Sequence, residues 1–201
     1  ASASSLGATA AATGDEPLSP PDYPVGSPLL WDPEPMGRPV TRDYAPHFGM
    51  FQKNGGSDPV DQLEWARDQG FTAWEDNQMT RRSVADQERI GAALQDLGMQ
   101  MGVFVANFGT AFGKKSFTTG DSRHMEAFLS DINKSVEVAK RVGAKWMTIV
   151  LGDQNPRARQ GTQDADAIEM LKRGAEIFEP HNLVMVMEPL NFRDHSGMYL
   201  E

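Results

Sequence analysis

The feature that most constrains the fold of this chain is a strand–helix–stop pattern that occurs four times after residue 47. Short apolar runs alternate with longer segments of helical periodicity, and a Gly or an Asn follows each predicted helix. Such a series of strand–helix units predicts a parallel sheet in an α/β fold. Strands are expected over residues 47–51, 71–75, 99–108, 144–151 and 183–187, and helices between Asp58 and Gly70 and over about 83–97, 122–142 and 164–178.

Three of the predicted strands are apolar at nearly every position, at residues 103–105, 146–151 and 183–187. Strands that are covered on both faces have this composition. Both an open doubly wound sheet and a (β/α)8 barrel fit the pattern. The sequence contains neither G-x-G-x-x-G nor a phosphate-binding loop with G-K-[ST], which favours the barrel. We therefore predict a (β/α)8 TIM barrel, of which this chain supplies about the first five βα units.

Residues 1–46 differ in composition from the rest of the chain. Ala, Ser, Thr and Gly dominate residues 1–14, and prolines are frequent from Asp15 to Pro46. Because proline lacks the N–H that helices and central strands need, we interpret residues 1–46 as an extended or disordered arm and 47–201 as the partial barrel. The small-residue start resembles the end of an export signal, so localisation is open between the cytoplasm and export to the periplasm.

The overall composition narrows the range of partners. Hydrophobic residues make up 39% and charged residues 23% of the chain, and the formal net charge is -9. An acidic chain repels phosphate backbones, which argues against a nucleic-acid partner. No apolar run approaches the ~18 residues of a membrane span. The absence of cysteine excludes disulfides, thiolate metal ligands and thiol catalysis.

In either parallel architecture the carboxyl ends of the strands form the ligand site. Glu188 is the most informative residue there, because five apolar residues precede it and Pro189 follows. A carboxylate that ends a buried strand is costly unless a metal, an arginine or a hydrogen-bond network compensates it. A functional site and a structural ion pair with Arg193 are both open.

Other candidates end the earlier strands. Glu75 and Asn107 could each bind a ligand or satisfy a loop, and Trp74 and Phe108 could line a pocket or fill the core. Among the histidines, His195 follows the fifth strand and is near the candidate site. His47 opens the first strand, which places it away from the active end.

The segment from Met187 to Asp194 reads Met-Glu-Pro-Leu-Asn-Phe-Arg-Asp, and it resembles hydroxypyruvate isomerases and their relatives in the xylose isomerase-like barrel superfamily. In that group a strand that ends in Glu-Pro-Leu-Asn, followed by Arg-Asp, is characteristic. Residues 48–51 are similar to the family's first strand, residues 70–75 to its second, and Asn107 matches a further strand end. The resemblance covers about residues 47–201.

The resemblance implies an isomerase or epimerase that acts on small hydroxy-carbonyl compounds or keto sugars. Glu188 would bind a divalent metal, most simply Mg or Mn, and move a proton from the carbon next to the carbonyl through an enediolate. The remaining implied substrate-binding residues are Glu75, Trp74, Asn107, Phe108, Asn191 and Arg193. A non-catalytic sugar-binding barrel is the alternative, and a DNA-repair endonuclease of the same superfamily is disfavoured by the net charge of -9.

By the same resemblance, the remaining metal ligands, an Asp, a His and a second Glu, belong to strands that would follow Glu201. We therefore expect this chain alone to lack half of the metal site and to leave strand edges unpaired. A chain that continues beyond Glu201 and a half-barrel that forms a homo-oligomer are both open.

Overall fold

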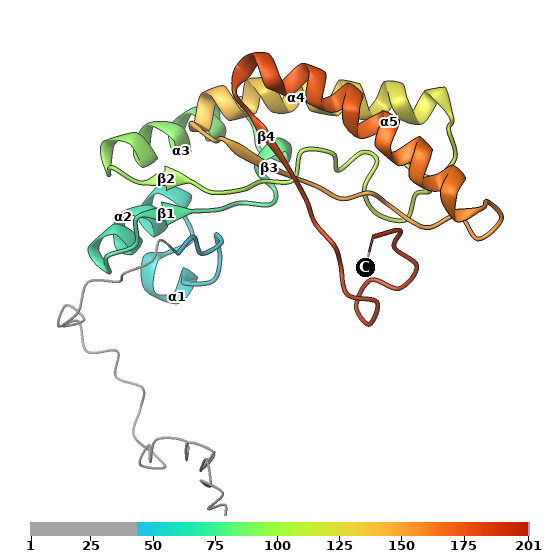
Figure 1. Cartoon of the computed structure of the whole chain (residues 1–201). Helices are drawn as coiled ribbons and strands as arrows, with labels where there is room; N and C mark the ends of the chain where they lie inside the picture. The colour runs from blue at the N-terminus through green and yellow to red at the C-terminus, as the bar shows by residue number, and fades with distance from the viewer. Residues whose placement is uncertain (1–43, 201) are drawn as a thin grey trace, which may run out of the picture. The chain divides into compact units, whose positions relative to one another are not determined.

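The computed structural model describes residues 44–200, all within one compact unit, as an α/β arrangement (Figure 1). The strands are β1 (Ala73–Trp74), β2 (Gln100–Met101), β3 (Trp146–Ile149) and β4 (Val184–Met187). The helices are α1 (Gln52–Gly55), α2 (Pro59–Asp68), α3 (Val84–Asp96), α4 (Ser122–Val142) and α5 (Gln160–Phe178), with 3-10 turns η1 (Met79–Arg81) and η2 (Glu179–His181).

The strands pair in parallel and in chain order, as the strand–helix pattern predicts. β1 pairs with β2, and β3 pairs with β4 with Trp146 opposite Val184 and Ile149 opposite Met187. Isolated parallel bridges continue this strand order. One joins His47 to Glu75 at the edge next to β1, and the other joins Val105 to Thr148 between the β1–β2 pair and the β3–β4 pair. The carboxyl ends of all these strands therefore lie at one edge.

The helices begin and end close to the predicted residues because the capping chemistry is local. The side chains of Asp58, Ser83 and Asp121 accept hydrogen bonds from backbone N–H groups in the first turns of α2, α3 and α4. Gly143 ends α4 in the left-handed conformation, with φ of 68°. One boundary differs: α5 begins at Gln160 rather than at residue 164.

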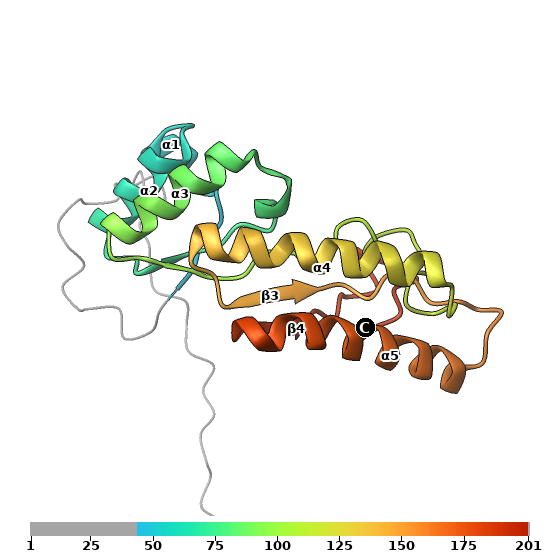
Figure 2. The ribbon, with the colours of Figure 1, turned by 90° about the horizontal axis from the view of Figure 1, so that it is seen from above.

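The two long helices α4 and α5 lie side by side against β3 and β4 (Figures 1 and 2). The contact is close at Gly174, where an added Cβ would lie 2.4 Å from the terminal methyl of Met185 and 2.9 Å from the Phe128 ring. The largest fully buried side chains lie between the strands and the helices and include Trp74, Phe104, Phe117, Phe128, Phe178 and Leu63.

The predicted first strand over residues 47–51 is wrong beyond its first residue. His47 forms a bridge, but the chain then turns and enters the short helix α1. Gly49 has φ of 92° and its N–H donates to Oε1 of Gln62 at 2.8 Å, so the backbone leaves the sheet there. The apolar pattern has another cause, because Phe48 packs on Trp74, with ring centroids 5.3 Å apart.

The prediction that the fifth strand is covered on both faces is also wrong for the described chain. Met185 faces α5, yet Val184 and Val186 are 40% and 38% exposed. Their neighbour Trp146 on β3 is 40% exposed. Since side chains alternate along a strand, these residues share the face opposite the helices. We call this face of β3 and β4, with the strand ends beside it, the open face.

Residues 1–46, which we interpret from the sequence as an extended or disordered arm, lie largely outside the described residues, which begin at residue 44. Of its last residues, Pro46 belongs to the sheet, because its carbonyl accepts a hydrogen bond of 3.0 Å from the Glu75 N–H. Within residues 44–200, no helix has the length and apolar character that crossing a membrane requires.

The close approach of α3 to α4 gives a test of the fold. At Gly91 an added Cβ would lie 2.0 Å from the carbonyl oxygen of Arg141, whereas at Gly161 in α5 it would meet nothing within 4 Å. We expect Gly91→Ala to lower the free energy of unfolding by about 1–3 kcal/mol through overpacking. Gly161→Ala should leave it unchanged or raise it slightly. Urea titration of both variants measures this, and equal midpoints would contradict the packing.

Candidate functional site

Two carboxylates mark the carboxyl edge of the sheet. Glu188 follows β4, and its N–H continues the ladder by donating to the Ile149 carbonyl at 3.1 Å. Because Met185 faces α5, alternation along the strand directs Glu188 to the same open face as Val184 and Val186. Glu75 follows Trp74 of β1, whose ring is fully buried in the core, and so also turns away from the helices.

His47 lies beside Glu75. The Nε2 of His47 is 2.7 Å from Oε1 of Glu75, with the side chains 41% and 22% exposed. The prediction that His47 lies away from the active end is therefore wrong. It assumed that residue 47 begins a strand, whereas His47 forms a single bridge to Glu75 and the chain turns directly after it.

The pKa of Glu75 is raised above its ordinary value, first because burial penalises the charged carboxylate. The neighbouring His47 opposes this rise, and the negative charge of Glu188 adds to it. Because the charge of Glu188 contributes to this rise, the two carboxylates interact electrostatically across the region between the ends of β1 and β4. That region is negative, which suits a cation or the hydroxyl groups of a polar ligand.

The carboxylate of Glu188 has no hydrogen bond or ion pair with the described residues. Arg193, the partner considered in the sequence, is exposed and forms no ion pair with it among residues 44–200. An uncompensated, partly buried carboxylate at a strand end is a feature of functional sites. Asp76 is the contrast: it is 5% exposed and compensated by Nε of Arg82, whose guanidinium also lies over the Phe48 ring.

Asn107 is fully buried and joins the ends of two strands. Its Nδ2 donates to the Val150 carbonyl at 2.8 Å and to Oγ1 of Thr110 at 3.1 Å, and its Oδ1 accepts from the Val150 N–H at 3.1 Å. These bonds use both amide donors. Contact of Asn107 with a substrate stays a prediction, and the observed bonds favour the structural alternative.

The aromatic candidates separate into two environments. Trp74 lies in the core, fully buried, so its role as pocket lining stays a prediction that its position does not support. Phe108 is partly exposed and lies 6.4 Å from the ring of Phe112. Phe112 is 41% exposed and lies 5.9 Å from the His195 ring. The rings of Phe108, Phe112 and His195 thus form a series of contacts from the end of the third predicted strand, residues 99–108, to the loop after β4.

The loop after β4 contains Asn191 and Arg193, and side-chain hydrogen bonds stabilise its first turn and its end. The Asn191 side chain organises the turn, since its Oδ1 accepts from the N–H groups of Arg193 and Asp194 at 3.1 Å each. At the loop's end, the Tyr199 hydroxyl donates to Asp164 of α5. Burial and this carboxylate raise the pKa of Tyr199 to about 12.

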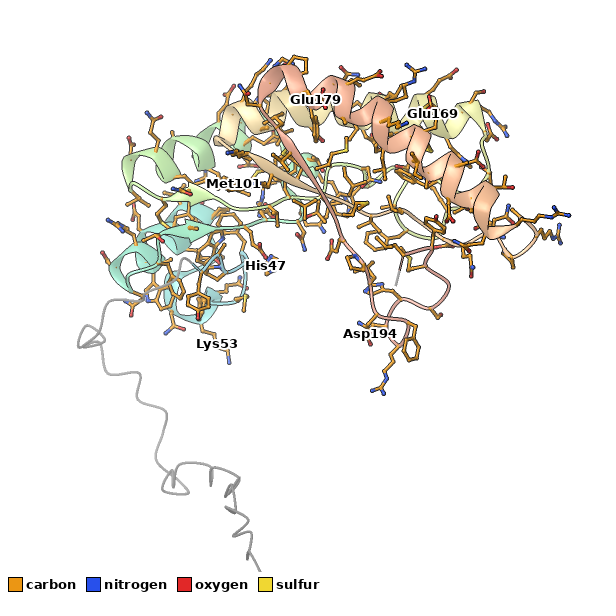
Figure 3. All side chains as sticks on the ribbon, in the orientation of Figure 1. His47, Lys53, Met101, Glu169, Glu179 and Asp194 are labelled. Atoms are coloured by element: carbon orange, nitrogen blue, oxygen red, sulfur yellow. The ribbon has the colours of Figure 1, made fainter. Side chains whose placement is uncertain are left out.

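Figure 3 shows His47 and Asp194 on the side of the strands opposite Glu169 and Glu179, which lie on the helix side. The structure thus brings Glu75, Glu188 and His47 to one side of the sheet. The Asn191 side chain stabilises the turn that it belongs to. Substrate contact by Asn191 or Arg193 stays a prediction.

The described residues do not contain a group of three or more His, Asp and Glu side chains able to hold a metal ion. Glu188 is therefore a single candidate ligand and not a complete site. A cavity of about 620 Å³ lies elsewhere, where β2 and β3 diverge at their amino ends, and is lined by residues such as Leu94, Gln100, Val142 and Trp146. None of the predicted site residues lines it.

Comparison with known proteins identifies the type of barrel. A family model described as xylose isomerase-like TIM barrel matches residues 63–199. No curated protein matches the chain. A crystal structure described as an AP endonuclease, family 2, from Brucella melitensis is similar, with a TM-score of 0.61 and 16% identity over 79% of this chain and 59% of that one.

Two epimerase structures are also similar. A 3-keto-D-glucoside 4-epimerase from E. coli has a TM-score of 0.57 and 13% identity, over 73% of this chain and 56% of that one. A D-psicose 3-epimerase from Clostridium cellulolyticum H10, crystallised with D-tagatose, has a TM-score of 0.55 and 10% identity, over 79% and 55%. At these identities the likeness shows the fold, and the chain spans little more than half the length of these structures.

The buried amide of Asn107 predicts a stability effect. Asn107→Leu should lower the free energy of unfolding by about 2–4 kcal/mol, because it leaves the buried N–H and C=O of Val150 unpaired. The control is Asn133→Leu on the exposed surface of α4, where the lost bond to the Leu129 carbonyl is solvent-exposed. Urea titration compares the two, and equal stabilities would show that Asn107 is not needed to join the strands.

The shared field of the two carboxylates predicts a titration shift. In Glu188→Gln the pKa of Glu75 should fall, because the repulsion that disfavours its charged form is removed. Glu169→Gln, which removes an exposed carboxylate on α5, should leave it unchanged. Carboxyl ¹³C NMR titration measures both variants. A Glu75 pKa that is the same in wild type and Glu188→Gln would mean that the carboxylates do not share a site.

Proposed function

Because this chain belongs to the xylose isomerase-like TIM barrel family, we propose that it forms the amino-terminal part of an isomerase or epimerase. Its substrates would be small hydroxy-carbonyl compounds or keto sugars. Interconversion would proceed by proton transfer through an enediolate, with Glu188 as the group that moves the proton.

The observation that carries the proposal is the state of the Glu188 carboxylate. It ends a strand at the ligand-binding edge, is partly buried, lies in the field of Glu75, and has no partner among residues 44–200. A carboxylate held in this way can take the proton from a carbon next to a carbonyl and return it to the same or the neighbouring carbon. Proton return from the opposite side requires a second acid–base group, which the family resemblance assigns to a later strand.

The metal is part of the proposal. A bound Mg²⁺ or Mn²⁺ would stabilise the negative charge that develops on the carbonyl oxygen, and carboxylate oxygens suit either ion. Among residues 44–200, Glu188 is the candidate ligand, and its unpaired carboxylate is consistent with such a role. The protein's own contribution is to hold this carboxylate on a rigid strand end through the Ile149 hydrogen bond.

The structural neighbours support the reaction class. Those described as epimerases act on ketoses or keto-sugar derivatives by their names, and they share this fold. The neighbour described as an AP endonuclease represents the nucleic-acid branch. Against that branch, the formal net charge of this chain is -9, and the candidate carboxylates make the open face negative.

Solvent exchange tests the proposal. Incubation of the whole protein with D-fructose or hydroxypyruvate in D₂O, with Mg²⁺ or Mn²⁺ present, should incorporate deuterium next to the carbonyl, detected by ¹H NMR. Glu188→Gln should lower the exchange rate by more than about 100-fold while the protein stays folded, because general base catalysis is lost. Glu169→Gln, an equally conservative change on exposed α5, should retain the rate.

Two outcomes would contradict the proposed role. Near-native exchange in Glu188→Gln would exclude Glu188 as the proton-moving group. Sugar binding by the wild type without any exchange would favour the alternative of a non-catalytic sugar-binding barrel.

A further inference from the structure

We propose that His47 is a positioning residue that holds Glu75 so that its second carboxylate oxygen accepts a hydrogen bond from a substrate hydroxyl distant from the carbons on which Glu188 acts. The inference rests on the proposed function for the role of Glu188. It adds a hydroxyl-recognition group at the far side of the same site, and with it a preference for longer polyhydroxy substrates.

The ion pair is built by adjacent strand ends. His47 and Glu75 are bridge partners, and the Glu75 N–H donates to the carbonyl of Pro46 at 3.0 Å. The two side chains therefore leave neighbouring strands at the same level. Their contact joins Nε2 to Oε1 at 2.7 Å, so the imidazole orients the carboxylate with one specific N–H.

The other oxygen of Glu75 is available. No hydrogen bond joins Oε2 to the residues that the structure describes, while the side chain is 22% exposed. Gly102 packs closely against the base of the Glu75 side chain, because an added Cβ there would lie 3.2 Å from the Cβ atoms of both Glu75 and Ala45. An ionised carboxylate accepts through both oxygens, so a substrate hydroxyl can donate to Oε2 while His47 occupies Oε1.

A contribution to folding stability does not account for the His47–Glu75 ion pair. An ion pair with side chains 41% and 22% exposed contributes little to folding. The strands are already joined by the backbone bond from Glu75 to Pro46. The buried carboxylate in this region, Asp76, has its own compensation from Arg82. What the His47 contact adds is a fixed direction for the Glu75 carboxylate, which is the property that ligand recognition needs.

The separation of the two carboxylates along the sheet assigns them different parts of a substrate. Glu75 ends β1 and Glu188 follows β4, with β2 and β3 between them. Three inter-strand steps amount to roughly 14 Å along the sheet, which is an upper bound for two carboxylates that interact electrostatically. A three-carbon compound held at Glu188 extends less far toward Glu75 than a pentose or hexose, whose chain carries hydroxyls further along.

The test compares two substrates across a set of variants. D-fructose and hydroxypyruvate are assayed for deuterium exchange in D₂O with the whole protein, and KM and kcat are determined for each. His47→Leu removes the N–H that orients Glu75, Glu75→Gln removes the charged acceptor, and His47→Gln retains an N–H donor. Glu169→Gln is the control for loss of a carboxylate elsewhere.

For D-fructose, His47→Leu and Glu75→Gln should raise KM by about ten- to a hundredfold with kcat changed less than about threefold, the size expected for one charge-assisted hydrogen bond. His47→Gln should restore most of the loss. Hydroxypyruvate kinetics and the urea midpoint should change little in all three variants. Equal effects on both substrates, or a loss confined to kcat, would overturn the inference.

The two proposals fail differently. If wild type exchanges hydroxypyruvate but neither binds nor exchanges D-fructose, the proposed reaction stands and the role of Glu75 and His47 is excluded. If wild type exchanges neither substrate, the proposed function fails, and D-fructose affinity measured by calorimetry decides this inference alone. A tenfold weaker affinity in His47→Leu would support it, whereas equal affinities or absence of binding would exclude it.

Discussion

The junction between β2 and β3 is the contact on which the candidate site depends. The four strands form two separate two-stranded ladders, and these are joined by the bridge from Val105 to Thr148 and by the buried amide of Asn107 on the backbone of Val150. Ser135 of α4 adds a hydrogen bond to the Ala106 carbonyl. Since Glu75 belongs to one ladder and Glu188 to the other, this junction sets how far apart the two carboxylates lie.

The carboxylates of the described chain differ in how their charge is compensated. Asp76 and Asp58 are compensated by arginines, as carboxylates with a structural role usually are. Glu188 has no such partner among residues 44–200, and Glu75 is paired with His47 rather than with an arginine. Glu75 and Glu188 thus place negative charge at the strand ends on the open face, where a polar or cationic ligand can satisfy it.

The helices and the order of the strands could be predicted from the sequence because their causes are local. Capping by Asp58, Ser83 and Asp121 and the stop at Gly143 operate within a few residues. Residues 47–51 show where this fails. Their apolar pattern reads equally as a strand, and only the bond from Gly49 to the distant Gln62 and the packing of Phe48 on Trp74 show that the chain turns.

The sequence by itself determined the α/β class and the xylose isomerase-like resemblance, and it singled out Glu188 as the candidate catalytic residue, because periodicity, capping and the segment around Pro189 are readable along the chain. The tertiary structure decided which side chains meet. It placed His47 against Glu75, assigned the amide of Asn107 to Val150, and left Glu188 without Arg193. The first two outcomes depend on contacts between residues far apart in sequence, and the third on the conformation of the loop after β4, and no local pattern encodes that geometry.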